Sequence, residues 1–302
     1  MTGPWKTKKG LWGTVKRSAF LPLRYGLSPA KTRRQLQLMI SSLQRLEVTP
    51  TINLTAYNLD SCPDIVRDLD GVDVGIHGYR HLPYSNLSPK DQACDLDRAI
   101  AAFRRHGLPT KGFRGPYLKT NDVTRKVLES RGFTYDSSIP RMSFGMGGAL
   151  TSRLAVLART RYGEVDSSPS FPTKVGGLVE IPVSLPDDEL IVDGMGVRKV
   201  STMKRILGLM LERTMATSSL LVLQIHPERY SYCAEAINSV VKSAAAAGAW
   251  RPSLTEIAEW MVRRSDGSSS WFNGYPFALV VTGDLDALSL PDFVHRTTGG
   301  TR

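Results

Sequence analysis

The sequence predicts an α/β protein whose strands and helices alternate in one barrel-like domain. Short apolar segments recur along the 302 residues, and most are followed by a stretch with apolar residues at helical spacing. Polar residues stand directly after several of these apolar segments, and βα barrels carry their chemistry at the ends of many strands. A doubly wound sheet shares the alternation, so the polar strand ends favour the barrel.

The predicted elements follow one another from residue 28. The segment "SPAKTRRQLQLMISSLQRL" (28–46) predicts a helix with Ser28 as N-cap and Pro29 in the first helical position. Strands are predicted in "TPTINLTAY", "VDVGI", "GFRG", "FTYDSS", "GLVEIPVSLP", "SSLLVLQI" and "FALVVTGDL". Further helices are predicted at 89–106, 122–130, 201–215, 233–248 and 253–263. The Gly- and Ser-rich interval 141–178 carries no motif that we can interpret.

The positive charge of the chain is concentrated near its beginning. The formal net charge is +11, yet residues 1–46 hold ten Lys or Arg and no acid, so the remainder has 29 cations and 28 acids. We divide the chain into a basic aromatic arm (1–26) and one domain (27–302). Tryptophans interleave with the cations, so residues 1–20 are expected to contact an anionic membrane, unless the arm only aids solubility. No readout motif accompanies them, and no nucleic-acid partner is expected.

Cysteine usage and hydropathy predict a cytoplasmic protein. Cys62, Cys94 and Cys233 are widely separated, which gives neither a disulfide framework nor a thiolate-rich zinc site. The sequence has no signal-peptide pattern and no run of roughly 18 apolar residues. We therefore expect a cytoplasmic location, with peripheral attachment at the inner membrane face if the arm binds lipid.

Two of the five histidines lie four residues apart in "DVGIHGYRHLPYS" (73–85), after a predicted strand. Side chains at i and i+4 share a face if the intervening residues turn helically, and neutral imidazole is a common metal ligand. His77 and His81 are therefore candidate ligands of one ion. A chance pair of surface or capping histidines is the alternative.

Two other strand ends carry residues suited to hydrolytic chemistry. Arg114 lies in "GFRGPYL", where Gly115 and Pro116 fix an irregular backbone that can aim the guanidinium and nearby amides at one point. His226 ends the apolar segment "LVLQI", where an imidazole is well placed as a general acid or base. A surface arginine in a turn and a structural histidine are the corresponding alternatives.

The segments "HGYRH", "RGPY", "YDSS" and "LQIHP" occur in that order, from about residue 49 to residue 226. In this arrangement the chain resembles the polysaccharide deacetylases of the NodB-homology family, also called carbohydrate esterase family 4. The resemblance implies a distorted (β/α)7 barrel and a metal-dependent amidohydrolase. It also implies a role for each matching residue: metal ligands His77 and His81, general acid His226, Arg114 bracing the catalytic base, and the Tyr117 amide at the oxyanion.

The family's first motif, Thr-Phe-Asp-Asp-Gly, is missing from its usual place. Its first Asp is the base and its second is the third metal ligand, but here Arg24 and Tyr25 stand where the two acids belong. The C-terminal "ALVVTGDLDAL" looks like the absent motif, which predicts a circularly permuted barrel in which Asp284 is the base and Asp286 a ligand. Chain termini often lie close together, so such a rearrangement is geometrically simple. An ordinary acidic turn is the alternative.

Three more acids follow predicted strands and are possible additional site residues. Asp187 and Asp188 in "SLPDDEL" could reach the site as a second source of carboxylate. Asp136 belongs to "YDSS", which departs from the family's fourth motif in having Ser138 and no nearby Trp. Whether Asp136 orients His226 is therefore left open.

These observations together predict a carbohydrate N-deacetylase that binds one divalent metal ion. Zn is preferred, although two histidines and a carboxylate can also hold Co, Mn or Fe. The expected substrate is an N-acetylated sugar of a glycan or a lipid-linked glycoconjugate. An O-acetyl esterase or deformylase on the same scaffold, and a carbohydrate-binding protein without activity, are the alternatives.

Overall fold

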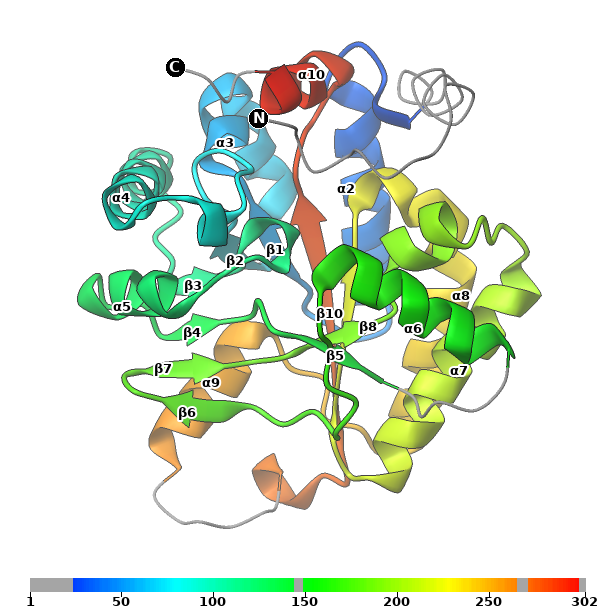
Figure 1. The fold of residues 1–302 in the computed structure, drawn as a ribbon. Coiled ribbons are helices and arrows are strands. Elements are labelled where there is room, and N and C mark those ends of the chain that lie inside the picture. The colour runs from blue at the N-terminus through cyan, green and yellow to red at the C-terminus, as the bar shows by residue number, and fades with distance from the viewer. Residues whose placement is uncertain (1–23, 144–148, 265–270, 299–302) are drawn as a thin grey trace.

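The structure is a computed structural model that describes residues 24–143, 149–264 and 271–298. Its centre is a curled eight-stranded sheet in the order β6-β7-β4-β3-β2-β1-β10-β9 (Figure 1). Neighbouring strands are parallel except for β6 and β7. Their bounds are β1 (Thr51–Leu54), β2 (Asp73–Ile76), β3 (Gly112–Phe113), β4 (Tyr135–Asp136), β6 (Thr173–Val175), β7 (Leu178–Glu180), β9 (Leu220–Ile225) and β10 (Ala278–Leu285).

The sheet curls without closing into a complete barrel. Strands β5 (Pro140–Met142) and β8 (Val183–Leu185) form a separate parallel pair. β8 lies against the open edge of β9, where the Val222 amide donates to Ser184 Oγ at 2.9 Å. The Ser184 hydroxyl thus accepts a hydrogen bond that a backbone carbonyl of a neighbouring strand would accept in a closed barrel. The predicted α/β class is confirmed, and the barrel takes the form of a curled, open sheet.

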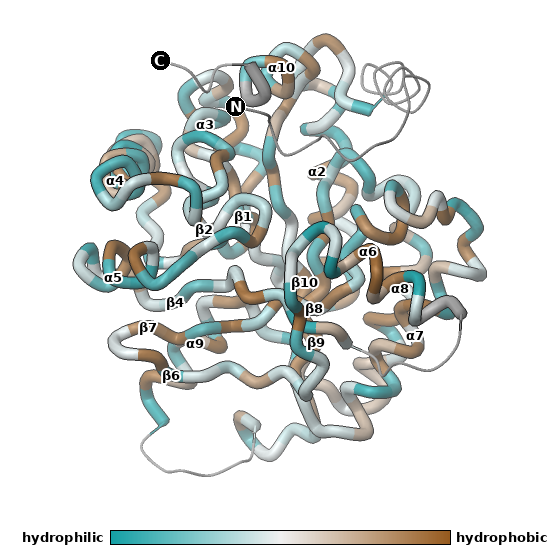
Figure 2. Tube along the Cα trace, in the orientation of Figure 1, coloured by the Kyte–Doolittle hydropathy of each residue, from teal (hydrophilic) through white to brown (hydrophobic). Residues whose placement is uncertain are grey.

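Helices cover the convex face of the sheet and its two ends. They are α2 (Ala30–Gln44), α3 (Ala56–Ser61), α4 (Pro89–Arg105), α5 (Asp122–Ser130), α6 (Ala149–Tyr162), α7 (Val200–Ala216), α8 (Tyr230–Ala246), α9 (Leu254–Arg263) and α10 (Leu290–Thr298). Hydrophilic and hydrophobic residues alternate along them, as on α4 (Figure 2). Among the described residues no helix is long and apolar enough to cross a membrane.

Two local predictions about helices need correction. The first helix begins at Ala30 with Pro29 in the capping position, so Ser28 is not its N-cap. The interval 141–178, for which the sequence predicted no element before "GLVEIPVSLP", contains α6, β6 and most of β5. Of the predicted N-terminal arm, residues 1–23 lie outside the described part of the chain.

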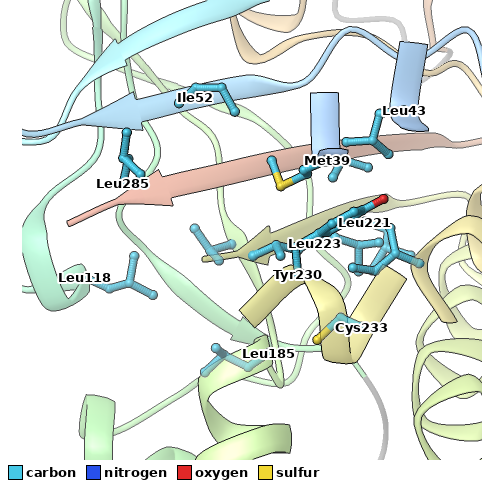
Figure 3. Packing of buried hydrophobic residues seen from close by; sticks show 14 of the residues in the cluster. Met39, Leu43, Ile52, Leu118, Leu185, Leu221, Leu223, Tyr230, Cys233 and Leu285 are labelled. Atoms are coloured by element: carbon cyan, nitrogen blue, oxygen red, sulfur yellow. The ribbon is translucent and has the colours of Figure 1, made fainter. Parts of the chain in front are cut away.

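The outer faces of the central strands form the main hydrophobic core. Leu285 of β10, Ile52 of β1 and Leu223 of β9 pack beneath α2 and α8 (Figure 3). Packing is tight at Gly283, where a Cβ would lie 2.6 Å from Met39 Cε and would force that side chain of α2 to move. Close packing of this kind fixes the central strands rigidly, which is what a precise site requires.

The inner faces of the strands change from apolar to polar along their length. At the amino ends of β9 and β10 the inner face is apolar. A second buried cluster there contains residues of α9 together with Leu220, Val222, Ala278 and Val280. On β10 the same face continues with polar residues at alternate positions, since side chains of a strand alternate between its two faces. α9 therefore packs at the end of the sheet where β9 and β10 begin, while α3 and α10 lie at the end to which β10 points (Figure 1).

Candidate metal and catalytic site

The carboxyl ends of the parallel strands bring the predicted site residues together. His77 follows β2, Arg114 follows β3, and His226 follows β9. β10, which carries Asp284, pairs in parallel with both β1 and β9. Residues separated by more than 200 positions therefore meet at one end of the sheet.

His77, His81 and Asp286 form a cluster suited to a metal ion. One possible ligand atom from each residue lies within 4.8 Å of the other two, and among the described residues this is the one such group of three. The Nε2 atoms of His77 and His81 lie 3.3 and 3.1 Å from Asp286 Oδ1. Two imidazoles and one carboxylate are a donor set that zinc accepts, with further positions left for water or substrate.

The tautomer of His77 is fixed by the backbone. Its Nδ1 lies 2.6 Å from the carbonyl oxygen of Arg114. A carbonyl only accepts hydrogen bonds, so Nδ1 carries a proton and Nε2 is the nitrogen that faces Asp286 as a possible metal ligand. The residues present thus fit a divalent ion.

The loop that carries both histidines is held by one half-buried acid of α4, Asp95. Asp95 accepts hydrogen bonds from the Tyr79 amide at 2.9 Å and the Tyr84 hydroxyl at 2.7 Å. Gly78 has φ +74°, and a Cβ there would lie 2.9 Å from the Arg80 carbonyl oxygen. The turn between the two histidines therefore requires glycine.

Asp284 lies on the inner face of β10 and is bound by two donors. Arg114 Nη1 lies 3.2 Å from Asp284 Oδ1 and 3.1 Å from Oδ2, and Asn53 Nδ2 donates to Oδ1 at 2.9 Å. Arg114 Nη2 also donates to Ser137 Oγ at 3.0 Å. All of these side chains are buried. Arg114 thus contacts the acid predicted as the base.

The "RGPY" segment has a strained backbone. Tyr117 and Leu118 have φ values of 60° and 53°, in the left-handed region that non-glycine residues adopt only at a cost of about 1–3 kcal/mol each. The Gly115 amide donates to Ser138 Oγ at 2.7 Å, and the His81 and Tyr117 rings meet edge to face at 4.3 Å. The turn is therefore braced beside a candidate metal ligand.

Asp136 supports this turn, and within the described part of the chain it makes no contact with His226. The Ser138 hydroxyl, which accepts from Gly115, donates to Asp136 Oδ1. Burial raises the pKa of Asp136 to about 7, against the lowering effect of the Ser138 hydrogen bond. The structure therefore places Asp136 in the support of the "RGPY" turn.

Asp188 is the acid that binds His226. Its Oδ1 lies 2.7 Å from His226 Nδ1, and its Oδ2 accepts from the His226 amide at 2.7 Å. Burial by itself lowers the pKa of His226, but the charge of Asp188 and the hydrogen bond to it outweigh burial, so the pKa is raised well above its ordinary value. His226 is thus held protonated, with Nδ1 engaged and Nε2 as its second donor.

Asp187 lies outside the metal cluster. It accepts from the Tyr162 hydroxyl and, at 2.9 Å, from the Leu190 amide at the start of a short π-helix (Glu189–Gly194). Burial, together with the charges of Glu189 and Asp188, raises its pKa to about 6. Of the two acids in "SLPDDEL", the structure brings only Asp188 to a predicted catalytic residue.

Asn53 is a polar residue of the site that the sequence reasoning did not identify. It belongs to the predicted strand "TPTINLTAY", where its alternation with Ile52 and Leu54 indicates the inner face. That alternation is a signal for a polar inward residue, but it does not reveal the partner, which lies 231 residues away.

Comparisons with known proteins show what part of this chain is similar to. The family model for polysaccharide deacetylases matches residues 30–135, about a third of the chain. The resemblance to this family is therefore confirmed over a segment that includes "HGYRH" and "RGPY". Among curated proteins, the peptidoglycan deacetylase-like protein FGM2 of Gibberella zeae is 36% identical over 70 residues. That stretch is 23% of this chain, and the chain spans only 21% of that protein's length.

Solved structures support the same fold. A Mycobacterium smegmatis protein, assigned without proof as a polysaccharide deacetylase, matches 86% of this chain and 85% of its own with a TM-score of 0.63 and 22% identity. A Pseudomonas aeruginosa PAO1 protein with an equally unproven assignment matches 76% of this chain and 73% of its own, with a TM-score of 0.59 and 18% identity. At these identities the likeness shows the fold, so the activity has to be argued from the site.

Proposed function

We propose that the protein is a metal-dependent hydrolase that removes the N-acetyl group from an N-acetylated sugar. One observation carries this proposal: two histidines and Asp286 converge at the strand ends beside an Arg-bound Asp284 and an Asp-bound His226. Amide hydrolysis needs a base for water, an acid for the departing nitrogen and stabilisation of an oxyanion, roles that we give to Asp284, His226 and the Tyr117 amide.

The chain's own residues divide the proton transfers between two ends of the site. Asp284 takes a proton from the attacking water, and its position is fixed by Arg114. His226, held protonated by Asp188, donates a proton to the leaving nitrogen, so that the amine departs in place of an unstable anion. The Tyr117 amide, on its strained turn, donates to the developing oxyanion.

The metal would be held by His77, His81 and Asp286. A divalent ion bound there supplies Lewis acidity toward the acyl oxygen and makes water more acidic. We propose zinc, with Co, Mn and Fe as the metals to compare, because the three ligands suit each of them.

The decisive experiment measures acetate released from N-acetylglucosamine oligomers by chelated protein and by protein reloaded with each metal. We expect activity only after metal addition, and loss of about 10²-fold or more in kcat for Asp284→Asn. Full activity of Asp284→Asn would refute the assignment of the base. Release of acetate only from O-acetylated sugars, or of formate only from N-formylated sugars, would assign the esterase or deformylase alternative instead. No release with stoichiometric metal bound would favour a binding protein.

We also propose that the chain is circularly permuted relative to the family. Supporting this, β10 is the last of the described strands, lies between β1 and β9, carries Asp284 and is followed by Asp286. The match to the family model begins at residue 30, at the start of α2. A variant with residues 271–298 transferred ahead of α2 should keep the fold and the metal affinity, and loss of both would contradict the permutation.

We further propose a lipid-linked substrate at the cytoplasmic face of the membrane. The described end of the arm lies beside the site: the Tyr25 hydroxyl donates to Glu228, two residues past His226, at 3.2 Å, and Arg24 pairs with Asp193 at 2.6 Å. Because the basic arm joins the domain at this point, binding of the arm to anionic lipid would hold the site near the membrane. Deletion of residues 1–17 should abolish binding to anionic vesicles while activity on soluble oligomers persists. Unchanged vesicle binding would refute this role.

A further inference from the structure

We propose that Asn53 is a positioning residue that orients Asp284, so that Oδ2 of this acid is the oxygen that receives the proton from water. The inference rests on the proposed function, because it concerns the base of that reaction. It is carried by the contacts of Asn53 with its two neighbouring strands.

The register of the sheet places Asn53 directly beside Asp284. The two residues are paired Cα partners on the parallel strands β1 and β10, and both side chains point to the inner face. Asn53 is 0% exposed and Asp284 is 1% exposed. Because a carboxylate only accepts hydrogen bonds, the amide must turn its Nδ2 toward Asp284, where it lies 2.9 Å from Oδ1.

The two oxygens of Asp284 are bound unequally. Oδ1 accepts from Asn53 Nδ2 at 2.9 Å and from Arg114 Nη1 at 3.2 Å. Oδ2 accepts from Arg114 Nη1 at 3.1 Å, and in the described part of the chain no second donor to it is found. Asn53 therefore engages a lone pair of Oδ1 and leaves more of the acceptor capacity of Oδ2 for water.

Gly75 provides the space that this amide needs. It is the Cα partner of Asn53 on β2, on the opposite side from Asp284. A Cβ at position 75 would lie 2.3 Å from Asn53 Oδ1, closer than real Cβ atoms approach. Gly75, Asn53 and Asp284 thus form one row across β2, β1 and β10. The glycine leaves space for the Asn53 amide, and the amide donates a hydrogen bond to Asp284.

The expected effect of losing Asn53 is on the chemical step. Asn53 is neutral, so its removal leaves the charge of the site unchanged. It takes away one of the two donors that hold the carboxylate against rotation about its Cβ–Cγ bond. Misplacement of a catalytic group by about 1 Å can cost about 10²-fold in rate. Asn53 is not one of the proposed metal ligands and makes its contact to the base, so KM and metal affinity should stay near their original values.

The test compares Asn53→Leu with a matched control on the same strand. In Asn53→Leu we expect kcat on N-acetylglucosamine oligomers to fall by about 10- to 100-fold, with KM and zinc affinity within about twofold of the original. Thr51→Val is the control, since Thr51 is equally buried on the same face but bonds Asp73 and the Leu254 amide at the other end of the strand. It should lower thermal stability and preserve kcat.

A double-mutant cycle separates positioning from general damage. Gly75→Ala should lower kcat by displacing Asn53, and in an Asn53→Ala background it should lower kcat no further. If Gly75→Ala lowered kcat equally in the wild-type and Asn53→Ala backgrounds, Gly75 would not act through Asn53. That result would refute the proposed role of Gly75. Unchanged kcat in Asn53→Leu, or the same kcat loss in Thr51→Val, would overturn the role of Asn53. A wild-type protein with no activity on any acylated sugar would instead overturn the proposed function, and this inference with it.

Discussion

Replacement of Asp136 by Asn should stabilise the protein increasingly as the pH rises. Burial raises the pKa of Asp136 from 3.8 to about 7, so between these values the folded protein keeps a proton that the unfolded chain has lost. The free energy of unfolding of the wild type therefore falls as pH rises through this window. At about 1.4 kcal/mol for each pH unit, the complete shift corresponds to at most about 4 kcal/mol. Asn carries no such penalty and can still accept from Ser138.

The assay is guanidinium unfolding followed by tryptophan fluorescence, with a chelator present, at several pH values. The advantage of Asp136→Asn over the wild type should grow by about 2–3 kcal/mol between pH 5 and pH 8. Asp122→Asn is the control, because the side chain of Asp122 is 84% exposed and its effect should be nearly independent of pH. An advantage of Asp136→Asn that is constant across this range, or absent, would refute the reasoning.

Three further predictions concern the general acid, the metal and the core. Asp188→Asn should lower the pKa of His226, whose charged form it supports, so the alkaline limb of the kcat profile should move to lower pH; an unmoved limb would contradict this. Asp286→Asn should weaken zinc binding, measured by calorimetry, by more than the ~10- to 100-fold typical of outer-shell losses, and equal affinity would exclude it as a ligand. Leu54→Ala, at a fully buried position of β1, should cost about 2–5 kcal/mol of unfolding free energy, and a loss below about 1 kcal/mol would contradict the packing.

The strands were predictable because each has an apolar segment bounded by turn residues, and the structure places a strand in all seven predicted segments. α6 was missed because its helix lies in a Gly- and Ser-rich interval and its apolar residues form no single stripe. Tertiary contacts hold it instead: Lys119 Nζ donates to the Tyr162 carbonyl at its last turn, and Arg161 pairs with Glu189. Such contacts leave no periodic signal in the sequence.

The candidate site was partly predictable for a related reason. Residues that follow a strand reveal themselves by position, which is how His77, Arg114 and His226 were selected. Asp286 was selected instead because its segment looks like the family's absent first motif. Which side chain forms a hydrogen bond with each of these residues depends on the strand order and on loop packing, which the local sequence does not show. Asp188 binds His226 from a loop 38 residues earlier, and neither its sequence position nor its residue type distinguishes it from Asp187.

The central position of β10 has a consequence for biosynthesis. This strand is made after the other strands of the sheet, yet its neighbours are β1 and β9, so both must present open hydrogen-bonding edges until it emerges from the ribosome. Open edges can pair with other chains, and long-range parallel pairing is slow. A nascent chain that stalls before residue 278 would thus lack Asp284 and Asp286 and would also be prone to aggregate through its open strand edges. In cells, we expect such fragments to depend on chaperones and to be degraded rather than to accumulate.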